Sequence, residues 1–211
     1  MGALATPYEW LLIVYEINTL LKKSSEAWGA QMLKMKNDRM PDIAFRIMSF
    51  MFKIRDFFSS VDKILYEFDI HKGDTIIDYG CGPGRYLKMA SSLVGEKGRV
   101  YAADIHELAI NASMERIKKY NLKNISTVQI DKYSCPVEDN TADVIYALDM
   151  FHMVSEPENF LAELHRIIKK DGHIIIEDGH QSRKKTRSNI DRTGLWSVVD
   201  ENKRHLKCNP I

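Results

Sequence analysis

Three glycines at alternate positions follow a short apolar run, and this feature restricts the fold more than any other. The stretch TIIDYGCGPGRYLKMA (75–90) begins as a buried strand, continues through Gly80, Gly82 and Gly84, and ends in a helical pattern. Glycine lets the backbone turn sharply and lets a ligand approach the main chain, because no Cβ stands in the way. The stretch therefore predicts a ligand site at the carboxyl end of a parallel strand.

Strand-like and helix-like segments alternate from residue 73 onward. Short apolar runs typical of strands occupy 74–80, 98–105, 125–131, 142–151 and 173–179. Amphipathic segments typical of helices occupy 84–95, 106–122 and 155–172. This alternation predicts a parallel sheet with right-handed crossovers. The stretch 194–210 reads as two more strands around the turn ENK, which adds an antiparallel edge.

The ends of two helices carry their own signals. Gly95 is expected to stop the helix that follows the glycine loop. In 155–172, Ser155 is expected to cap the helix, with Glu158 completing a capping box and Gly172 acting as the stop.

The predicted fold class is therefore α/β, with a Rossmann-like, doubly wound, mostly parallel seven-stranded sheet and an antiparallel edge. Residues 1–70 read as helical, with one helix starting at Thr6. A second follows Pro41, and its apolar residues recur every three or four positions over 43–58. We interpret 1–70 as an N-terminal helical cap, either a core-facing stripe or a substrate lid, on a core formed by 71–211.

Acidic residues end three of the predicted strands, and they indicate what the glycine loop holds. A dinucleotide loop needs G-x-G-x-x-G, and Arg85 stands where its last glycine belongs. Asp78 beside the loop would repel a pyrophosphate but suits an ammonium group. Asp104 can accept hydrogen bonds from ribose hydroxyls, and Asp131 is placed to meet the edge of a base. Together these residues favour a nucleoside that carries an amino acid and no phosphate.

The sequence resembles the class I S-adenosylmethionine-dependent methyltransferases. The resemblance rests on the successive motifs DYGCGPGRY, VYAADI, ID and ADVIYALDMFHMV and covers about 73–180. It fits best the small-molecule branch that includes the ubiquinone/menaquinone C-methyltransferases. The resemblance implies that the chain is a methyltransferase, with S-adenosyl-L-methionine as cofactor and S-adenosyl-L-homocysteine as its product.

Each candidate cofactor residue has an expected role. By the resemblance, Asp78 and the loop hold the methionine end, Asp104 holds the ribose, Asp131 lies near the adenine amino group, and Leu148 lies beside the methionine portion. Ile105 is placed to pack on the adenine face. The candidate cofactor-binding residues are Asp78, Gly80, Cys81, Gly82, Gly84, Asp104, Ile105, Asp131 and Leu148.

Candidate catalytic residues follow the fourth and fifth strands. Methyl transfer requires a general base only when the nucleophile carries a proton of high pKa. His152 and His180 can titrate near neutral pH, so they are the candidate bases. Asp149 is placed either to contact substrate or to finish its strand. As alternatives to a catalytic role, His152 could pack against or cap the next helix, and His180 could belong to a turn.

Composition excludes several other classes of protein. The formal net charge of +1 over 211 residues gives no general attraction to nucleic acid or acidic membranes. Cys81, Cys135 and Cys208 are far apart, and no Cys/His group has metal-ligand spacing, so we expect neither disulfides nor a metal. The apolar stretch 10–21 is too short to span a membrane. A cytoplasmic setting is the expectation.

The acceptor stays open at this stage. We expect a small molecule, and the apolar helix at 43–58 suggests an apolar one. The alternatives are a methyltransferase acting on RNA or another nucleic acid, suggested by the basic stretches 182–187 and 203–207, and a module that binds the cofactor without catalysis. The basic stretches are also what a solvated helix face looks like.

Overall fold

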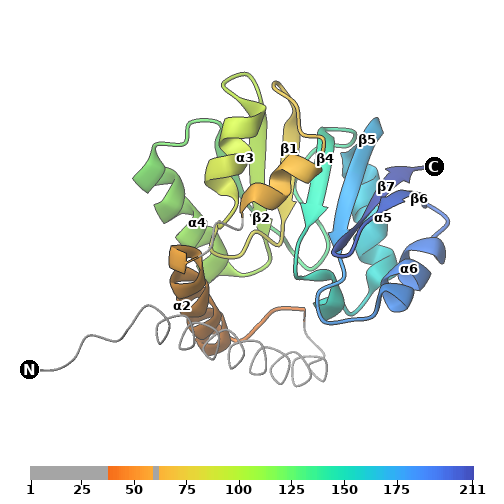
Figure 1. Cartoon of the computed structure of the whole chain (residues 1–211), viewed down its shortest axis with the longest axis horizontal. Helices are drawn as coiled ribbons and strands as arrows, with labels where there is room; N and C mark the ends of the chain where they lie inside the picture. The colour runs from red at the N-terminus through yellow and green to blue at the C-terminus, as the bar shows by residue number, and fades with distance from the viewer. Residues whose placement is uncertain (1–37, 59–61) are drawn as a thin grey trace, which may run out of the picture. The chain divides into compact units, whose positions relative to one another are not determined.

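Seven strands form one sheet in the order β3-β2-β1-β4-β5-β7-β6 in the computed structural model, which describes residues 38–58 and 62–211. Strands β1 to β5 pair in parallel, while β7 is antiparallel to both β5 and β6. Figure 1 shows β1 and β4 at the centre of this sheet. The predicted fold class and antiparallel edge are confirmed.

The elements alternate along the chain as predicted. The strands are β1 Thr75–Tyr79, β2 Arg99–Asp104, β3 Ile125–Gln129, β4 Ala142–Ala147, β5 Ile168–Glu177, β6 Trp196–Glu201 and β7 His205–Pro210. The α-helices are α2 Asp42–Phe58, α3 Leu87–Val94, α4 Glu107–Tyr120, α5 Pro157–Ile167 and α6 Arg183–Asp191. Two 3₁₀ helices, η1 Asp62–Glu67 and η2 Phe151–Met153, complete the set.

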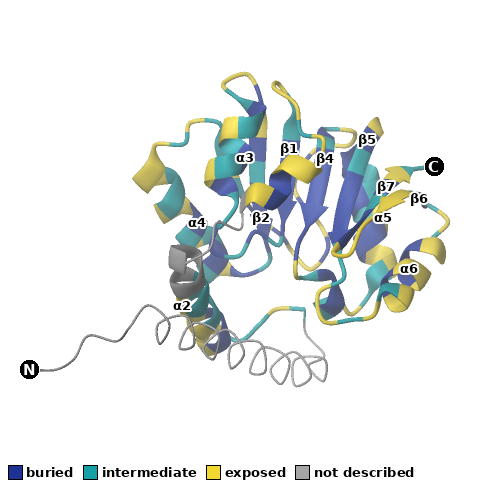
Figure 2. Ribbon diagram, in the orientation of Figure 1, coloured by how far each residue is buried: buried dark blue, intermediate teal, exposed yellow. Residues whose placement is uncertain are grey.

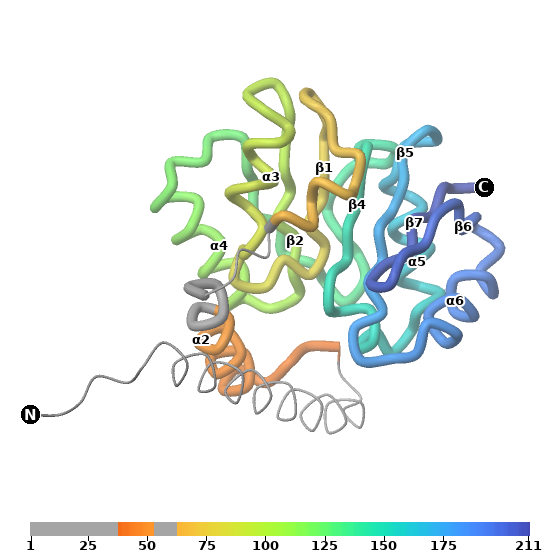
Figure 3. The backbone as a smooth tube through the Cα atoms, viewed as in Figure 1, coloured from red at the N-terminus to blue at the C-terminus, as the bar shows by residue number. Residues whose placement is uncertain are grey.

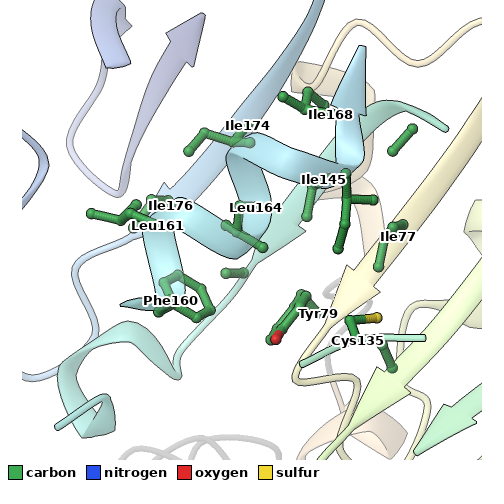
Figure 4. Packing of buried hydrophobic residues seen from close by; sticks show 14 of the residues in the cluster. Ile77, Tyr79, Cys135, Ile145, Phe160, Leu161, Leu164, Ile168, Ile174 and Ile176 are labelled. Carbon is green, nitrogen blue, oxygen red and sulfur yellow. The ribbon is translucent and has the colours of Figure 1, made fainter. Parts of the chain in front are cut away.

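Successive strand residues point to opposite faces, so the sheet carries two apolar layers. Ile76 belongs to the layer that includes Leu87 of α3 and Phe68, which follows η1, whereas Ile77 belongs to the layer that includes Leu164 of α5. Figure 4 shows the second layer, with Phe160, Leu161 and Leu164 of α5 facing the sheet. The central strands are accordingly buried (Figure 2). Because both faces are covered, the sheet is open only at its edges and at its strand ends.

The second layer is completed by a loop instead of a helix after β3. Tyr133, Cys135 and Val137 lie in the connection from β3 to β4 and are buried in this layer. The guanidinium of Arg166 donates to the carbonyl oxygens of Cys135 and Val137, at 2.9 and 2.8 Å. Backbone carbonyls of a buried loop are thus satisfied by a side chain of α5.

Several predicted helix boundaries are wrong. Gly95 does end α3, where its backbone N–H donates to the carbonyl of Ser91. However, α5 ends at Ile167, well before Gly172, because the chain passes directly into β5. Its N-cap is Glu156, so Ser155 is not the cap.

The residues expected to form the capping box have other partners. The Ser155 hydroxyl lies 3.1 Å from the Tyr133 hydroxyl. Glu158 instead forms an ion pair with Arg192, at 2.7 Å. The sequence signature S-x-x-E was present, but both side chains are used for contacts between elements.

Part of the expected N-terminal cap lies outside the described residues. The chain divides into two compact units, Met1–Lys36 and Asn37–Ile211, so α2 and η1 belong to the same unit as the sheet. The helix expected from Thr6 lies outside the described residues. Within those residues, no helix is long and apolar enough to span a membrane. Cys81, Cys135 and Cys208 are buried and free, as expected.

Candidate functional site

The glycine loop turns through three left-handed residues. Gly80, Gly82 and Gly84 have φ angles of 80°, 51° and 71°, a region that residues with a Cβ rarely adopt. The chain from β1 therefore reverses within five residues, and α3 begins only at Leu87. The alternating pattern seen in the sequence is thus required by the backbone conformation.

The surroundings of the three glycines differ. A Cβ at Gly80 would lie 2.9 Å from Cγ of Met150, and one at Gly84 would lie 2.7 Å from Cδ1 of Leu87. At Gly82 a Cβ would meet nothing within 4 Å. Gly80 and Gly84 are therefore needed for packing, whereas the space beside Gly82 is open to a ligand.

The loop is held by β2 and by α4. Backbone N–H groups of Gly80 and Cys81 both donate to the carbonyl oxygen of Ala103, at 2.8 and 3.0 Å. From α4, the Ser113 hydroxyl donates to Gly82 O, and the Arg116 guanidinium donates to Gly84 O. Sequence reasoning missed both α4 residues. Their position three apart on one helix face is the only signal they give.

Asp104 links the loop to the end of β2. Its carboxylate accepts the backbone N–H of Gly82 at 2.9 Å and that of His106 at 2.8 Å, and its residue is 8% exposed. Burial raises the pKa of Asp104, while the hydrogen bonds from these two amides oppose that rise. Each carboxylate oxygen has two lone pairs, so Asp104 keeps capacity for hydroxyl donors from a ligand.

Asp78 has no comparable partners. Its residue is 2% exposed, and its Oδ2 has no hydrogen-bond partner in the described part of the chain. Burial, together with the nearby Asp104 carboxylate, raises the pKa of Asp78 to about 8, although Tyr146 opposes this. Two buried carboxylates without a cation cannot both ionise cheaply, so Asp78 holds its proton at neutral pH.

A cavity of about 440 Å³ lies at the carboxyl ends of the parallel strands. This is a size typical of small-molecule sites. Seven of the predicted site residues line it: Gly80, Cys81, Gly82, Asp104, Ile105, Leu148 and Asp149. The other five do not: Asp78, Gly84, Asp131, His152 and His180.

The five predicted residues outside the cavity wall have distinct positions. Asp78 is a buried residue of β1, and Gly84 is the last glycine of the loop, where it packs against Leu87 and Ser113. Asp131 does not end β3, which stops at Gln129, and it is exposed between the lining residues Ile130 and Lys132. His152 and His180 stand together behind the lining residue Gly179, with their ring centroids 4.9 Å apart.

One wall of the cavity is apolar and comes partly from α2. Phe45, Met48 and Phe52 line it from α2, and Met150, Met153 and Phe160 line it from the region after β4. The apolar residues expected to form a core-facing stripe on this helix are different from these lining residues. Ile43, Ile47 and Phe50 of that stripe are exposed, by 70%, 43% and 63%.

Helix α2 and the residues before it are tied to the rest of this unit at two points. The Phe45 ring packs on the His106 ring, with centroids 4.6 Å apart. Before α2, the Asp38 carboxylate accepts the Tyr133 hydroxyl at 2.5 Å and the Ser155 backbone N–H at 2.6 Å. In Figure 3, α2 lies beyond the ends of β1 and β4 from which the loop and the cavity arise. The idea that α2 acts as a lid stays a prediction.

The three predicted catalytic residues converge. Asp149, His152 and His180 each place one donor atom within 4.8 Å of the other two. Asp149 has a φ of 52°, an unusual conformation for a residue with a side chain. Burial lowers the pKa of His152, with an opposing contribution from Asp149, so its imidazole is neutral at pH 7. The cluster offers polar atoms at the rim of an otherwise apolar wall.

The site fits the cofactor that the sequence resemblance implies. The site combines three features at the ends of the strands. The Asp104 carboxylate has spare acceptor capacity, the space beside Gly82 is open, and the buried Asp78 carboxyl has an oxygen without a partner among the described residues.

Comparison with known proteins agrees with this description. Residues 70–207 match the sequence model of a family described as "Methyltransferase domain". A ubiquinone/menaquinone biosynthesis C-methyltransferase from Escherichia fergusonii is 30% identical over 108 residues, which are 51% of this chain and 43% of that relative. The chain thus matches less than half the length of the curated relative.

Solved structures are similar over a larger share. A SAM-dependent methyltransferase from Aquifex aeolicus is 32% identical with a TM-score of 0.63, covering 71% of this chain and 87% of the other. A putative S-adenosyl-L-methionine-dependent methyltransferase from Methanococcus maripaludis has a TM-score of 0.59 at 19% identity, covering 71% and 82%. The second likeness shows the fold alone.

The different surroundings of the glycines give a first prediction. We expect Gly84→Ala to lower the free energy of unfolding by about 2–4 kcal/mol, because left-handed strain adds to overpacking against Leu87. Gly82→Ala carries the strain alone and should cost about 1–2 kcal/mol. Urea unfolding of both variants measures the difference. Equal losses would mean that the packing around Gly84 is not limiting.

The buried proton on Asp78 gives a second prediction. The folded pKa of about 8 exceeds the unfolded value of 3.8, so the folded state holds a proton that the unfolded state has lost between these pH values. Stability from this group is present at low pH and is lost as pH rises to 8, at up to about 1.4 kcal/mol per pH unit. Urea unfolding from pH 5 to 8 should show a flatter profile for Asp78→Asn.

Asp171→Asn, at an exposed position of β5, is the matched control and should follow the wild-type profile. Parallel profiles for wild type and Asp78→Asn would show that Asp78 is ionised in the folded protein.

Proposed function

The chain belongs to the S-adenosylmethionine-dependent methyltransferases, and from this premise we propose that it methylates an apolar small molecule. The observation that carries the proposal is the cavity itself. It joins the glycine loop and Asp104 at one part of its wall to Phe45, Met48 and Met153 at another. A charged nucleoside and an apolar acceptor can therefore meet in one enclosed space.

The chain's own residues would hold the cofactor as follows. Asp104 would accept hydrogen bonds from the ribose hydroxyls, Ile105 would cover a face of the adenine, and Leu148 would lie beside the methionine portion. The space beside Gly82 leaves room for the ligand against the loop. When bound, the cofactor supplies an electrophilic methyl group on a positively charged sulfonium.

Asp131 and Asp78 would contribute less directly. Asp131 is exposed, so a hydrogen bond from it to the adenine amino group would compete with water. Asp78 is not in the cavity wall and holds its proton in the free protein, so it would attract a ligand's ammonium group only once that cation has lowered its pKa. Neither role requires the residue to lie in the part of the wall that the acceptor uses.

The remaining lining residues would orient the acceptor and exclude water. Exclusion of water from a methyl-transfer site prevents hydrolysis and strengthens electrostatic interactions. Tyr79 and Phe160 lie in the wall with ring centroids 5.2 Å apart, and aromatic faces favour a nearby cation. The Escherichia fergusonii relative is named as a quinone-biosynthesis C-methyltransferase, and this supports an apolar ring as acceptor.

The basic stretch 182–187 does not favour a nucleic-acid substrate. It lies on α6, where Arg183 pairs with Asp178 at 2.7 Å and Arg187 pairs with Glu201 at 2.9 Å. Charge that is already neutralised within the protein releases few counterions on binding to phosphates. The stretch thus has the character of a solvated helix face.

The role of Asp104 gives a third prediction. We expect Asp104→Asn to weaken S-adenosylhomocysteine binding by about 10–100-fold, because a charge-assisted hydrogen bond to the ribose is lost. Asp131→Asn should weaken it less, and Asp171→Asn not at all. Isothermal titration calorimetry on the folded variants, checked by circular dichroism, measures this. Unchanged affinity in Asp104→Asn would remove Asp104 from the ribose site.

The acceptor class gives a fourth prediction. With methyl-labelled S-adenosylmethionine, the chain should label apolar phenols and hydroquinones in preference to charged small molecules or RNA. Met48→Lys should reduce labelling of apolar acceptors at least about tenfold, because it places a charge in the apolar wall, while cofactor affinity stays near wild type. Preferential labelling of charged acceptors or RNA would contradict the proposal, and cofactor binding without any transfer would indicate a non-catalytic module.

A further inference from the structure

The candidate catalytic residues form a group whose chemistry differs from that of a single general base. Asp149, His152 and His180 offer one carboxylate and two imidazoles whose donor atoms lie within 4.8 Å of one another. Two imidazoles and one carboxylate are a donor set that binds divalent first-row transition metals. We propose that these three residues bind one such ion at the rim of the cavity, where an oxygen of the acceptor completes its coordination.

The sheet brings the three residues together. Asp149 and His152 follow β4, and His180 follows β5, the strand that pairs with β4 in parallel through Ala147 and Ile176. The two loops therefore leave the same edge of the sheet side by side. The two imidazole rings meet edge to face, with centroids 4.9 Å apart and planes at 87°, so they are in direct contact.

His152 is the buried member of the group and has unused hydrogen-bonding capacity. Its residue is 7% exposed, and its Nδ1 has no hydrogen-bond partner among the residues that the structure describes. A buried polar atom without a partner is rare and requires an explanation. Ring nitrogens of His106, His165 and His205 also lack partners among the described residues, so the convergence with Asp149 and His180 is what singles out His152.

The backbone around the group is unusual at two positions. Asp149 adopts a left-handed conformation, with a φ of 52°, and such strain persists where the surrounding structure requires it. At Gly179 a Cβ would collide with Nδ1 of His152, so only glycine lets the His152 ring lie against this turn and next to His180. Both features fix the positions of residues that contribute to the group.

The group needs only a small adjustment to hold an ion. Donors around an ion at about 2.1 Å stand roughly 3–3.5 Å apart, somewhat closer than the 4.8 Å limit here. Asp149 and His180 are exposed and can rotate toward the buried His152. Three protein ligands leave at least one position open, as in catalytic metal sites.

The open position would face the acceptor. Asp149 and Gly179 belong to the cavity wall, together with Glu177, which lies close enough to Asp149 for the two carboxylates to interact. An ion here would bind a phenol or enol oxygen as the oxyanion, with the proton released to water. This deepens the proposed function and rests on it only for the identity of the acceptor.

Metal binding can be tested without any assay of methyl transfer. The full chain, dialysed against EDTA and then freed of it, is titrated with Zn²⁺ in competition with a chromophoric chelator. We expect one Zn²⁺ per chain, and at least about tenfold weaker binding in Asp149→Asn and in His180→Ala. Asn tolerates the left-handed backbone, and His180 is exposed, so both variants should fold.

His71→Ala is the matched control, since it removes an exposed imidazole from another part of the protein. It should bind Zn²⁺ like the wild type. Co²⁺ should give visible absorption bands with the wild type that are lost in His180→Ala. Binding that is absent, or equal in the wild type, Asp149→Asn and His180→Ala, would overturn the inference.

Two further measurements separate this inference from the proposed function. S-adenosylhomocysteine titrated in EDTA reports the cofactor site alone, and labelling of phenols before and after chelation reports the role of the ion. Full labelling in EDTA would overturn the metal's role while the methyltransferase proposal stands. One-to-one Zn²⁺ binding that the variants weaken, without labelling of any acceptor, would support the metal site and contradict methyl transfer to phenols.

Discussion

The hydrogen bond from the Gly82 backbone to the Asp104 carboxylate is the contact on which the site depends. It joins the end of β1 to the end of β2 at 2.9 Å in a buried position, and a second amide, that of His106, fixes the other carboxylate oxygen. The same bond therefore sets the path of the glycine loop and the orientation of the acid. Because His106 also caps α4 and packs on Phe45, the loop, α4 and α2 share one anchor.

The electrostatics of the site follow from that anchor. Asp104 can remain an acceptor in a buried position because two amides stabilise its charge. Asp78 lacks such partners, so it keeps a proton. The Cys81 thiol lies between them, and burial and the two acids raise its pKa, so it packs as a neutral group. The three side chains illustrate that the site is acidic in composition but carries little net charge until a cation arrives.

Much of the fold could be predicted from the sequence, because period-two and period-3.6 patterns are local. The glycine loop, the mostly parallel doubly wound sheet with its antiparallel edge and the end of α3 at Gly95 are in this group. The boundaries of α5 could not be predicted, since Ser155 and Glu158 are used by Tyr133 and Arg192, which are distant in sequence. The same limit explains why Asp131 is exposed whereas Asp78 and Asp104, which look like it in the sequence, are buried.

Contacts between residues distant in sequence also limit what could be predicted about the candidate site. Residues at the end of one strand, such as Asp104 and Ile105, could be placed in the cavity wall from their position alone. The group of Asp149, His152 and His180 depends on the pairing of β4 with β5 and on the missing Cβ at Gly179, and neither is visible in residue spacing. A group of side chains shared by two loops is specified by the pairing of their strands, so a structure is needed to find it.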